Sequence, residues 1–161
     1  DLLSGGVPCY GVYATADGRY MAVGALEKKF WELLCDTLGR ADLKPFHLAF
    51  GAKGEKTRAE LSAVFASQPQ SHWVARFADI DCCVTPVLTI NEALDNEQLQ
   101  ARGMVVEADG IPQFAPPYKL SDYEFSIERN APAPGQHSED ILREAGFDAD
   151  AIDNLRQRGI I

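Results

Sequence analysis

The chain has 161 residues, of which 46% are apolar and 24% are charged, so it is long and apolar enough to form a folded core. Its formal net charge of −9 argues against a nucleic-acid partner, because such binding needs clustered Lys and Arg. No apolar run approaches the length of a membrane span, and no signal peptide is recognisable. We therefore expect a cytoplasmic protein without a membrane partner.

The sequence predicts an antiparallel hairpin at residues 9–26, followed by a helix at residues 27–38. Two aromatic and β-branched runs flank a tight turn at Asp17-Gly18. Gly39 then follows the helix, as is typical of a helix end. The helical spacing predicts an inward face of Phe30, Leu33, Leu34 and Leu38.

Loops, helices and strands are expected to follow in turn. Residues 40–55 contain a proline and two glycines and predict a loop, and residues 57–67 predict a helix with Leu61, Val64 and Phe65 on one face. Ser71 is expected to cap a third helix, with Trp73, Val74 and Phe77 inward. The run "CCVTPVLT" predicts a strand at a sheet edge, because Pro86 cannot donate a ladder hydrogen bond.

The last third of the chain predicts short elements and a linker. Thr89 and Glu92 have capping-box spacing for a helix at residues 90–98, "MVVEAD" predicts a strand, and the proline-rich "GIPQFAPPYKLS" predicts extended chain. The stretch "ERNAPAPGQHS" predicts a linker before two short helices capped by Ser138 and Asp148, the first ending at Gly146. Segregated strands and helices predict an α+β fold, with a helical tail.

Few residues carry a recognisable chemical pattern. The chain has no phosphate-binding glycine loop and no nucleophile elbow, and "LSGGVP" is only a weak glycine signal. The four cysteines (Cys9, Cys35, Cys82 and Cys83) form no CxxC pair and lie far from His47, His72 and His137, so we expect reduced, mostly buried thiols and no metal site. The pattern around Glu27 alone favours an ordinary carboxylate at a helix start.

Four strings in order resemble the class III CoA-transferase (CaiB/BaiF) family, and within it the α-methylacyl-CoA racemase branch. They are the "TADG" turn, "MAVGALE" with an aromatic soon after it, "CVTPVLT" with a following acidic helix, and "PAPGQHSEDILREAGF". The resemblance implies that residues 1–126 are a small mixed α+β domain, residues 127–137 a linker, and residues 138–161 a segment that returns to a Rossmann-like large domain. That large domain would lie outside this chain, and two whole subunits would interlock as a homodimer.

The resemblance also implies roles for individual residues. Glu27 matches a carboxylate that hydrogen-bonds a catalytic His of the large domain, and Tyr10 and Leu26 match positions that line the acyl pocket. The substrate would be an acyl-CoA thioester, with coenzyme A present as part of the substrate and no separate cofactor or metal. "EKK" at residues 27–29 departs from the "EPQ" common in racemases, so Lys28 and Lys29 could alter acyl preference or mark a transferase-like relative.

Three functions remain open on these grounds. The first is a 2-methylacyl-CoA racemase or epimerase that acts by α-proton transfer. The second is a CoA-transferase of the same family, in which a large-domain Asp forms a mixed anhydride. The third applies to the chain by itself, which would be an inactive dimerisation and substrate-closing domain.

Overall fold

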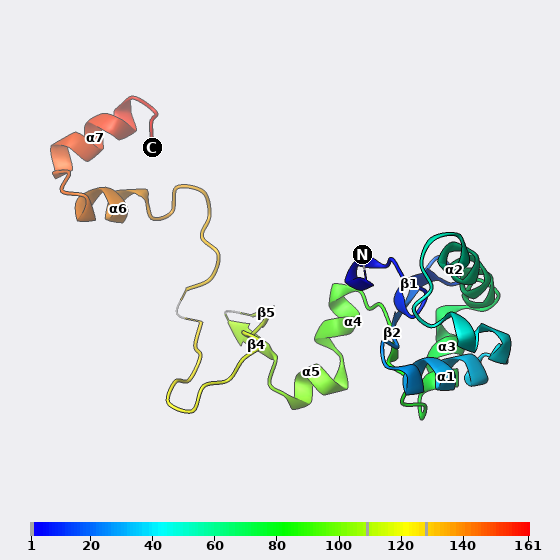
Figure 1. Ribbon diagram of the computed structural model, residues 1–161. Helices are drawn as coiled ribbons and strands as arrows, with labels where there is room; N and C mark the ends of the chain where they lie inside the picture. The colour runs from blue at the N-terminus through cyan, green and yellow to red at the C-terminus, as the bar shows by residue number, and fades with distance from the viewer. Residues whose placement is uncertain (1, 109, 128) are drawn as a thin grey trace. The chain divides into compact units, whose positions relative to one another are not determined.

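The computed structural model describes residues 2–108, 110–127 and 129–161. It divides into two compact units, one ending at Thr89 and the other beginning at Ile90. The first unit contains a three-stranded sheet with helices, and the second contains a two-stranded sheet with short helices (Figure 1). Antiparallel sheets with segregated helices confirm the predicted α+β class.

The sheet of the first unit separates a buried face from an open one. Strands β1 (Tyr10–Ala14), β2 (Tyr20–Gly24) and β3 (Val84–Pro86) pair antiparallel in that order, which confirms the hairpin and the edge position of the proline. Tyr13, Met21, Val23 and Val84 are buried, whereas the alternate residues of each strand are not. This alternation is what a sheet packed on one face requires.

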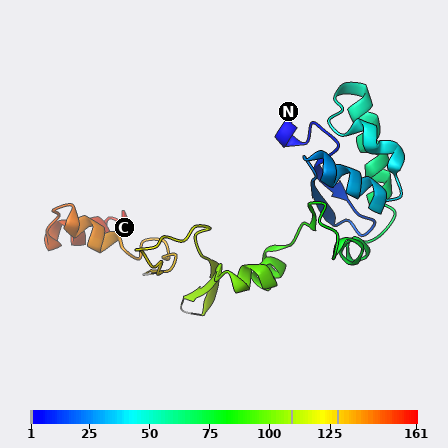
Figure 2. The same ribbon diagram turned by 60° about the horizontal axis from the view of Figure 1, so that its bottom comes forward.

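Three helices build the core against that buried face. They are α1 (Lys28–Thr37), α2 (Gly51–Phe65) and α3 (Gln70–Phe77), which Figures 1 and 2 show beside the hairpin. The 3₁₀ helix η1 (Leu2–Ser4) precedes β1, and η2 (Ala41–Phe46) lies between α1 and α2. The Phe65 ring lies at the centre, with ring centroids 5.2 Å from both Tyr13 and Trp73. The indole of Trp73 also donates a 2.8 Å hydrogen bond to the Phe65 carbonyl, so its polar atom is satisfied in the core.

Three sequence predictions in this unit need correction. In α1 the predicted Leu34 is buried and Phe30 and Leu38 pack against the core, but Leu33 is 39% exposed, and the buried Trp31 and Cys35 were not predicted. Helix α2 begins at Gly51 instead of residue 57. A side chain at Gly54 would overlap the Ala49 carbonyl, where a Cβ would stand 2.3 Å from the oxygen, so the glycine permits close packing rather than a loop.

The start of α3 also differs from the prediction. Pro69 occupies the N-cap position and Ser71 lies inside the helix, where Val74 is exposed. The Asp17 carboxylate, from the hairpin turn, accepts hydrogen bonds from the Gln70 N–H at 3.2–3.3 Å. The helix is thus capped by a residue far away in sequence, which local spacing cannot predict.

The second unit consists of short elements. These are α4 (Ile90–Leu94), α5 (Glu97–Ala101), β4 (Val105–Ala108), β5 (Ile111–Phe114), α6 (Ser138–Glu144) and α7 (Ala149–Gln157). The predicted helix at residues 90–98 is two helices, because Asn96 caps α5 with its side chain. The segment predicted as extended chain includes the paired strand β5, in which Pro112 faces Glu107 of the predicted strand β4.

The helices of the tail form largely as predicted. Asp148 caps α7 by accepting from the Ala151 N–H at 2.9 Å, and Gly146 follows α6 with a φ of 90°. His137, rather than Ser138, holds the N-cap position of α6. The predicted boundaries at residues 126 and 137 stay a prediction. Among the described residues, no helix is both long and apolar enough to cross a bilayer.

Candidate functional site

The residues singled out by sequence lie where the hairpin meets α1. Tyr10 opens β1 and pairs with Gly24, the last residue of β2. A Cβ at Gly24 would lie 4.0 Å from Cε2 of the Tyr10 ring and 3.9 Å from Cβ of Cys83. The absent side chain at Gly24 therefore leaves room between the tyrosine ring and the cysteine. Leu26 is half-buried against the core, two residues beyond this point.

The backbone between β2 and α1 is fixed by several hydrogen bonds. The Leu26 N–H donates to the Gly24 carbonyl at 2.9 Å, and His47 Nε2 lies 3.2 Å from the Ala25 carbonyl oxygen. The imidazole of His47 in turn stacks on Trp31, with ring centroids 6.1 Å apart. His47 was predicted only as a loop residue, yet it holds the segment that leads to Glu27.

Glu27 is the N-cap residue of α1, and its side chain is exposed. Its backbone carbonyl accepts from the N–H groups of Phe30 and Trp31 at 3.0 and 3.2 Å. Its carboxylate makes no side-chain capping hydrogen bond, unlike Asn96 and Asp148 at their own helices. The helix therefore fixes the position of Glu27 through the backbone and leaves the carboxylate available to another partner.

Cys83 lies beside this carboxylate and was not distinguished from the other cysteines by sequence. It has a φ of 57°, the only positive φ of a non-glycine in the described ranges, and its carbonyl accepts from the Gly24 N–H at 2.8 Å. Its thiol is exposed, whereas the other three cysteines are buried and free as predicted. Partial burial raises the pKa of the Cys83 thiol, the charges of Asp81 and Glu27 raise it further, and Lys29 lowers it.

A groove of about 690 Å³ lies on the open face of the sheet. Strand residues of that face form its floor, and the entry segment at Leu3 to Gly5, Cys83 and Arg58 form its walls. Tyr10 lines the groove, whereas Leu26 and Glu27 are not among the lining residues. Sequence reasoning missed Arg58. Its position in a helix, next to the buried Thr57, does not indicate that its guanidinium reaches the edge of the sheet.

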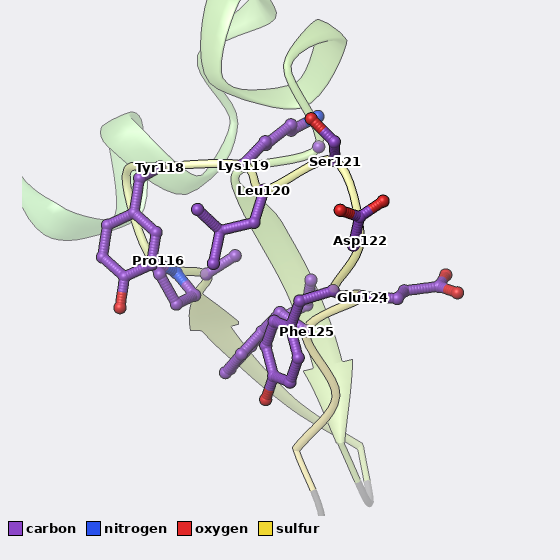
Figure 3. A pocket seen from close by; sticks show the side chains of 12 residues that line it. Pro116, Tyr118, Lys119, Leu120, Ser121, Asp122, Glu124 and Phe125 are labelled. Carbon is purple, nitrogen blue, oxygen red and sulfur yellow. The ribbon is translucent and has the colours of Figure 1, made fainter.

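A second cavity, of about 800 Å³, lies in the second unit between the β4–β5 hairpin and residues 115–125 (Figure 3). Tyr118, Leu120 and Phe125 line it together with Lys119 and Asp122, and the rings are largely exposed to solvent. None of the residues predicted from sequence lies in this cavity. The candidate site is therefore placed in the first unit.

Metal binding finds no support in the described part of the chain, where no three His, Cys, Asp or Glu side chains come together. His72 is exposed on α3 and stacks edge-on against Trp73, with centroids 5.0 Å apart. The acidic pair Asp79 and Asp81 likewise has no further ligand nearby to complete a cation site.

The chain is similar to known proteins along its whole length. It is 37% identical to human alpha-methylacyl-CoA racemase over 165 residues, covering 100% of this chain and 43% of that protein. It is 25% identical to mouse succinyl-CoA:glutarate CoA-transferase over 171 residues, covering 98% of this chain and 38% of that protein. The chain thus spans less than half the length of these curated relatives.

Solved structures share the fold. A CAIB/BAIF family protein from Brucella suis matches with a TM-score of 0.56 at 22% identity, over 88% of this chain and 38% of that one. Rv3272 from Mycobacterium tuberculosis matches with a TM-score of 0.57 at 22% identity, over 80% of this chain and 37% of that one. The sequence profile of CoA-transferase family III matches residues 3–138, and the chain therefore belongs to CoA-transferase family III, the CaiB/BaiF family.

Proposed function

We propose that this chain is the C-terminal part of an acyl-CoA-processing enzyme, and that the whole protein is a 2-methylacyl-CoA racemase or epimerase. The relative with which it shares 37% identity is named alpha-methylacyl-CoA racemase, and the alignment covers every residue of this chain. Because the chain spans 43% of that relative, the acid and base that act on the substrate would come largely from outside it.

The observation that supports this proposal most directly is the carboxylate of Glu27. A helix-start carboxylate with a purely local role would accept hydrogen bonds from the first N–H groups of α1, and Glu27 does not. Its exposed carboxylate is instead held at a fixed backbone position, beside Cys83 and Lys29. This arrangement suits a carboxylate that forms its hydrogen bond with a residue of another domain or subunit.

The chemistry gives this carboxylate a defined task. Inversion at the α-carbon of a thioester needs a base on one face and an acid on the other. If a His supplies one of these groups, a carboxylate hydrogen-bonded to the imidazole fixes its tautomer and stabilises its protonated form. Glu27 would then be a positioning residue for that His, and Tyr10 and Leu26 would contact the acyl group.

A CoA-transferase is the second candidate, and two observations favour it. Curated relatives named as CoA-transferases align over 94% and 98% of this chain. Lys28 and Lys29, two exposed cations, directly follow Glu27. In that case a nucleophilic carboxylate outside this chain would attack the thioester, and no α-proton would exchange.

The deciding experiment measures α-proton exchange by the longer protein with Glu27→Gln. In deuterated water with a chiral 2-methylacyl-CoA, we expect the exchange rate to fall roughly 10- to 1000-fold, the range typical of lost acid–base support. The matched control is Glu32→Gln, which removes the same charge one turn along α1, where Glu32 only pairs with Lys28 at 3.5 Å. We expect the control to exchange at the wild-type rate.

Two outcomes would overturn the proposal. Exchange at the wild-type rate by a correctly folded Glu27→Gln variant would leave Glu27 as a simple helix-start residue. Absence of exchange in the wild-type protein, together with transfer of CoA to a carboxylic acid, would establish the transferase instead. This chain alone, run beside the longer protein, should incorporate no deuterium, because its candidate site contains no acid–base pair.

A further inference from the structure

We propose that the groove on the open face of the first unit's sheet, which extends around the edge strand β1 to Arg58, is a carboxylate-binding site with Arg58 as its cationic residue. This inference deepens the proposed function, because it names a substrate group: the carboxylate of an organic acid. The carboxylate would belong either to a free acid or to an acyl chain that ends in one. The argument depends on how Arg58 is held, on the charges around it and on the lining of the groove.

The Arg58 guanidinium is fixed at the edge strand β1. Its Nη2 donates to the Gly5 carbonyl and, at 3.1 Å, to the Val7 carbonyl, so it joins α2 to the entry segment. Its Cζ lies 5.7 Å from the centroid of the Tyr13 ring. A Cβ at Gly11 would lie only 3.0 Å from Nη1, so the glycine leaves the space that the guanidinium occupies. The cation is thus positioned before any ligand arrives, which reduces the entropy lost on binding.

Within the described ranges, the Arg58 guanidinium hydrogen-bonds only through Nη2 and forms no ion pair, which leaves Nη1 and Nε for a ligand. Arg40, Lys44, Arg143 and Arg156, by contrast, each form an ion pair with an Asp or Glu. Although the chain has 24 acidic and 15 basic residues, half-buried Arg58 forms no ion pair with any Asp or Glu that the structure describes. The guanidinium fork fits a carboxylate with two parallel hydrogen bonds.

The rest of the groove suits the carbon chain of an acid. No Asp or Glu lines it, and the nearest acidic charges, those of Asp81 and Glu27, act at its Cys83 wall. Val12 and Ala22 give it an apolar floor, and Tyr10 and Thr85 place hydroxyl groups at its border. Its volume of about 690 Å³ lies within the roughly 300–1,000 Å³ typical of small-molecule sites. A short aliphatic acid can therefore lie along the edge strand β1 while its carboxylate meets Arg58.

The test uses the 161-residue chain, amide chemical shifts and sodium butyrate. We expect saturable shifts at β1 and β2 amides around Tyr10 to Val12 and Ala22 to Gly24, with a dissociation constant on the order of millimolar. Butyramide has the same shape without the charge, and it should bind at least 10-fold more weakly. Because this comparison leaves the protein unchanged, it does not depend on whether an Arg58 variant folds.

Variants then assign the charge to one residue. Arg58→Met keeps an unbranched apolar stem and should weaken butyrate binding at least 10-fold. Lys56→Met removes a charge from the exposed surface of the same helix and should leave binding unchanged. Competition distinguishes the two sources: displacement of butyrate by succinyl-CoA but not by butyryl-CoA indicates an acyl chain ending in a carboxylate. Displacement by succinate but by neither thioester indicates a free acid.

Several results would overturn the proposal. Equal affinity for butyrate and butyramide would show that the groove binds the carbon chain and does not recognise the carboxylate charge. Tighter binding of inorganic phosphate than of butyrate would replace the carboxylate by a phosphate, and shifts confined to Arg40 and Lys44 would place the anion elsewhere. Unchanged binding by a folded Arg58→Met variant would remove Arg58 from the site. All of these are binding measurements without turnover, so they stand apart from the α-proton exchange that tests the proposed function.

Discussion

The two units of this chain bury apolar side chains to very different extents. Among the residues that the structure describes, the buried apolar ones lie in the unit ending at Thr89, except Ile152 in α7. The second unit instead exposes large apolar side chains along its whole length, among them Ile111, Phe114, Tyr118, Leu120, Tyr123, Phe125, Ile141 and Phe147. The same chain therefore holds one region with its own core and one region nearly without.

This difference indicates which of the two units is the more stable. Burial of apolar surface is the main favourable term in folding, and a two-stranded ribbon with short helices is marginal by itself. The first unit should thus unfold as a cooperative domain, whereas the elements of the second unit should open locally at much lower free energy. Both tryptophans, Trp31 and Trp73, lie in the core of the first unit, so their fluorescence reports on that unit alone.

The largest effect on this comparison is expected from Phe65→Ala. The ring is fully buried and touches Tyr13, Trp73 and Phe77, so its removal leaves a cavity as well as lost contacts. We expect the free energy of unfolding of the first unit to fall by about 3–5 kcal/mol. Urea denaturation followed by tryptophan fluorescence measures it. A loss below about 1 kcal/mol would mean that this core is not the stabilising element.

An effect of intermediate size should appear at alkaline pH. Burial raises the pKa of Tyr13 to about 12, against the lowering influence of Arg58, and the phenol donates a 2.5 Å hydrogen bond to the Pro8 carbonyl. Burial also raises the pKa of Cys82 to about 11. The folded state holds these protons more tightly than the unfolded state. The contribution of the two groups to the free energy of unfolding is therefore fully present below pH 9 and is lost as pH rises from about 9 to 12.

The phenol contribution can be isolated with Tyr13→Phe. Its share of the alkaline loss is about 2–3 kcal/mol, from the difference between a pKa of about 12 and the ordinary value. The variant should lose about 1 kcal/mol at pH 7, through the missing hydrogen bond, and should then decline less steeply above pH 10. Identical alkaline slopes for the two proteins would assign the loss to other groups.

The first unit was the more predictable one from sequence, for a physical reason. The hairpin, the strand at Pro86 and α1 follow from short-range patterns: alternation, an Asp-Gly turn, and a glycine stop at Gly39 with a φ of 68°. What sequence misplaced depends on long-range contacts, such as the cap that Asp17 gives to α3 and the close packing at Gly54. In the second unit, β5 was missed because the prolines in and after it weaken strand pairing, although a two-stranded ribbon tolerates Pro112.

The candidate site shows the same division. Glu27, Tyr10 and Leu26 came from a family resemblance, and local pattern alone favoured an ordinary role for Glu27. The position of Cys83 with its φ of 57°, and the reach of Arg58 to Gly5, join segments more than 50 residues apart in sequence. Such contacts have no local signature. Glycines at 11 and 24 are the nearest hint, because both lie in strands where a side chain is expected and leave room for a neighbour instead.

The smallest effect is expected from Phe125→Ala, the same substitution made in the second unit. Phe125 is 41% exposed and lies over the β4–β5 hairpin in the cavity of Figure 3, so truncation removes few buried contacts. We expect the tryptophan-detected free energy of unfolding to stay within about 0.5 kcal/mol of wild type. Amide exchange at Val105 to Ala108 should already be fast in the wild type and should rise only slightly. A loss of more than 1 kcal/mol in the tryptophan signal would show that the two units share their stability, and the contrast between them would then fail.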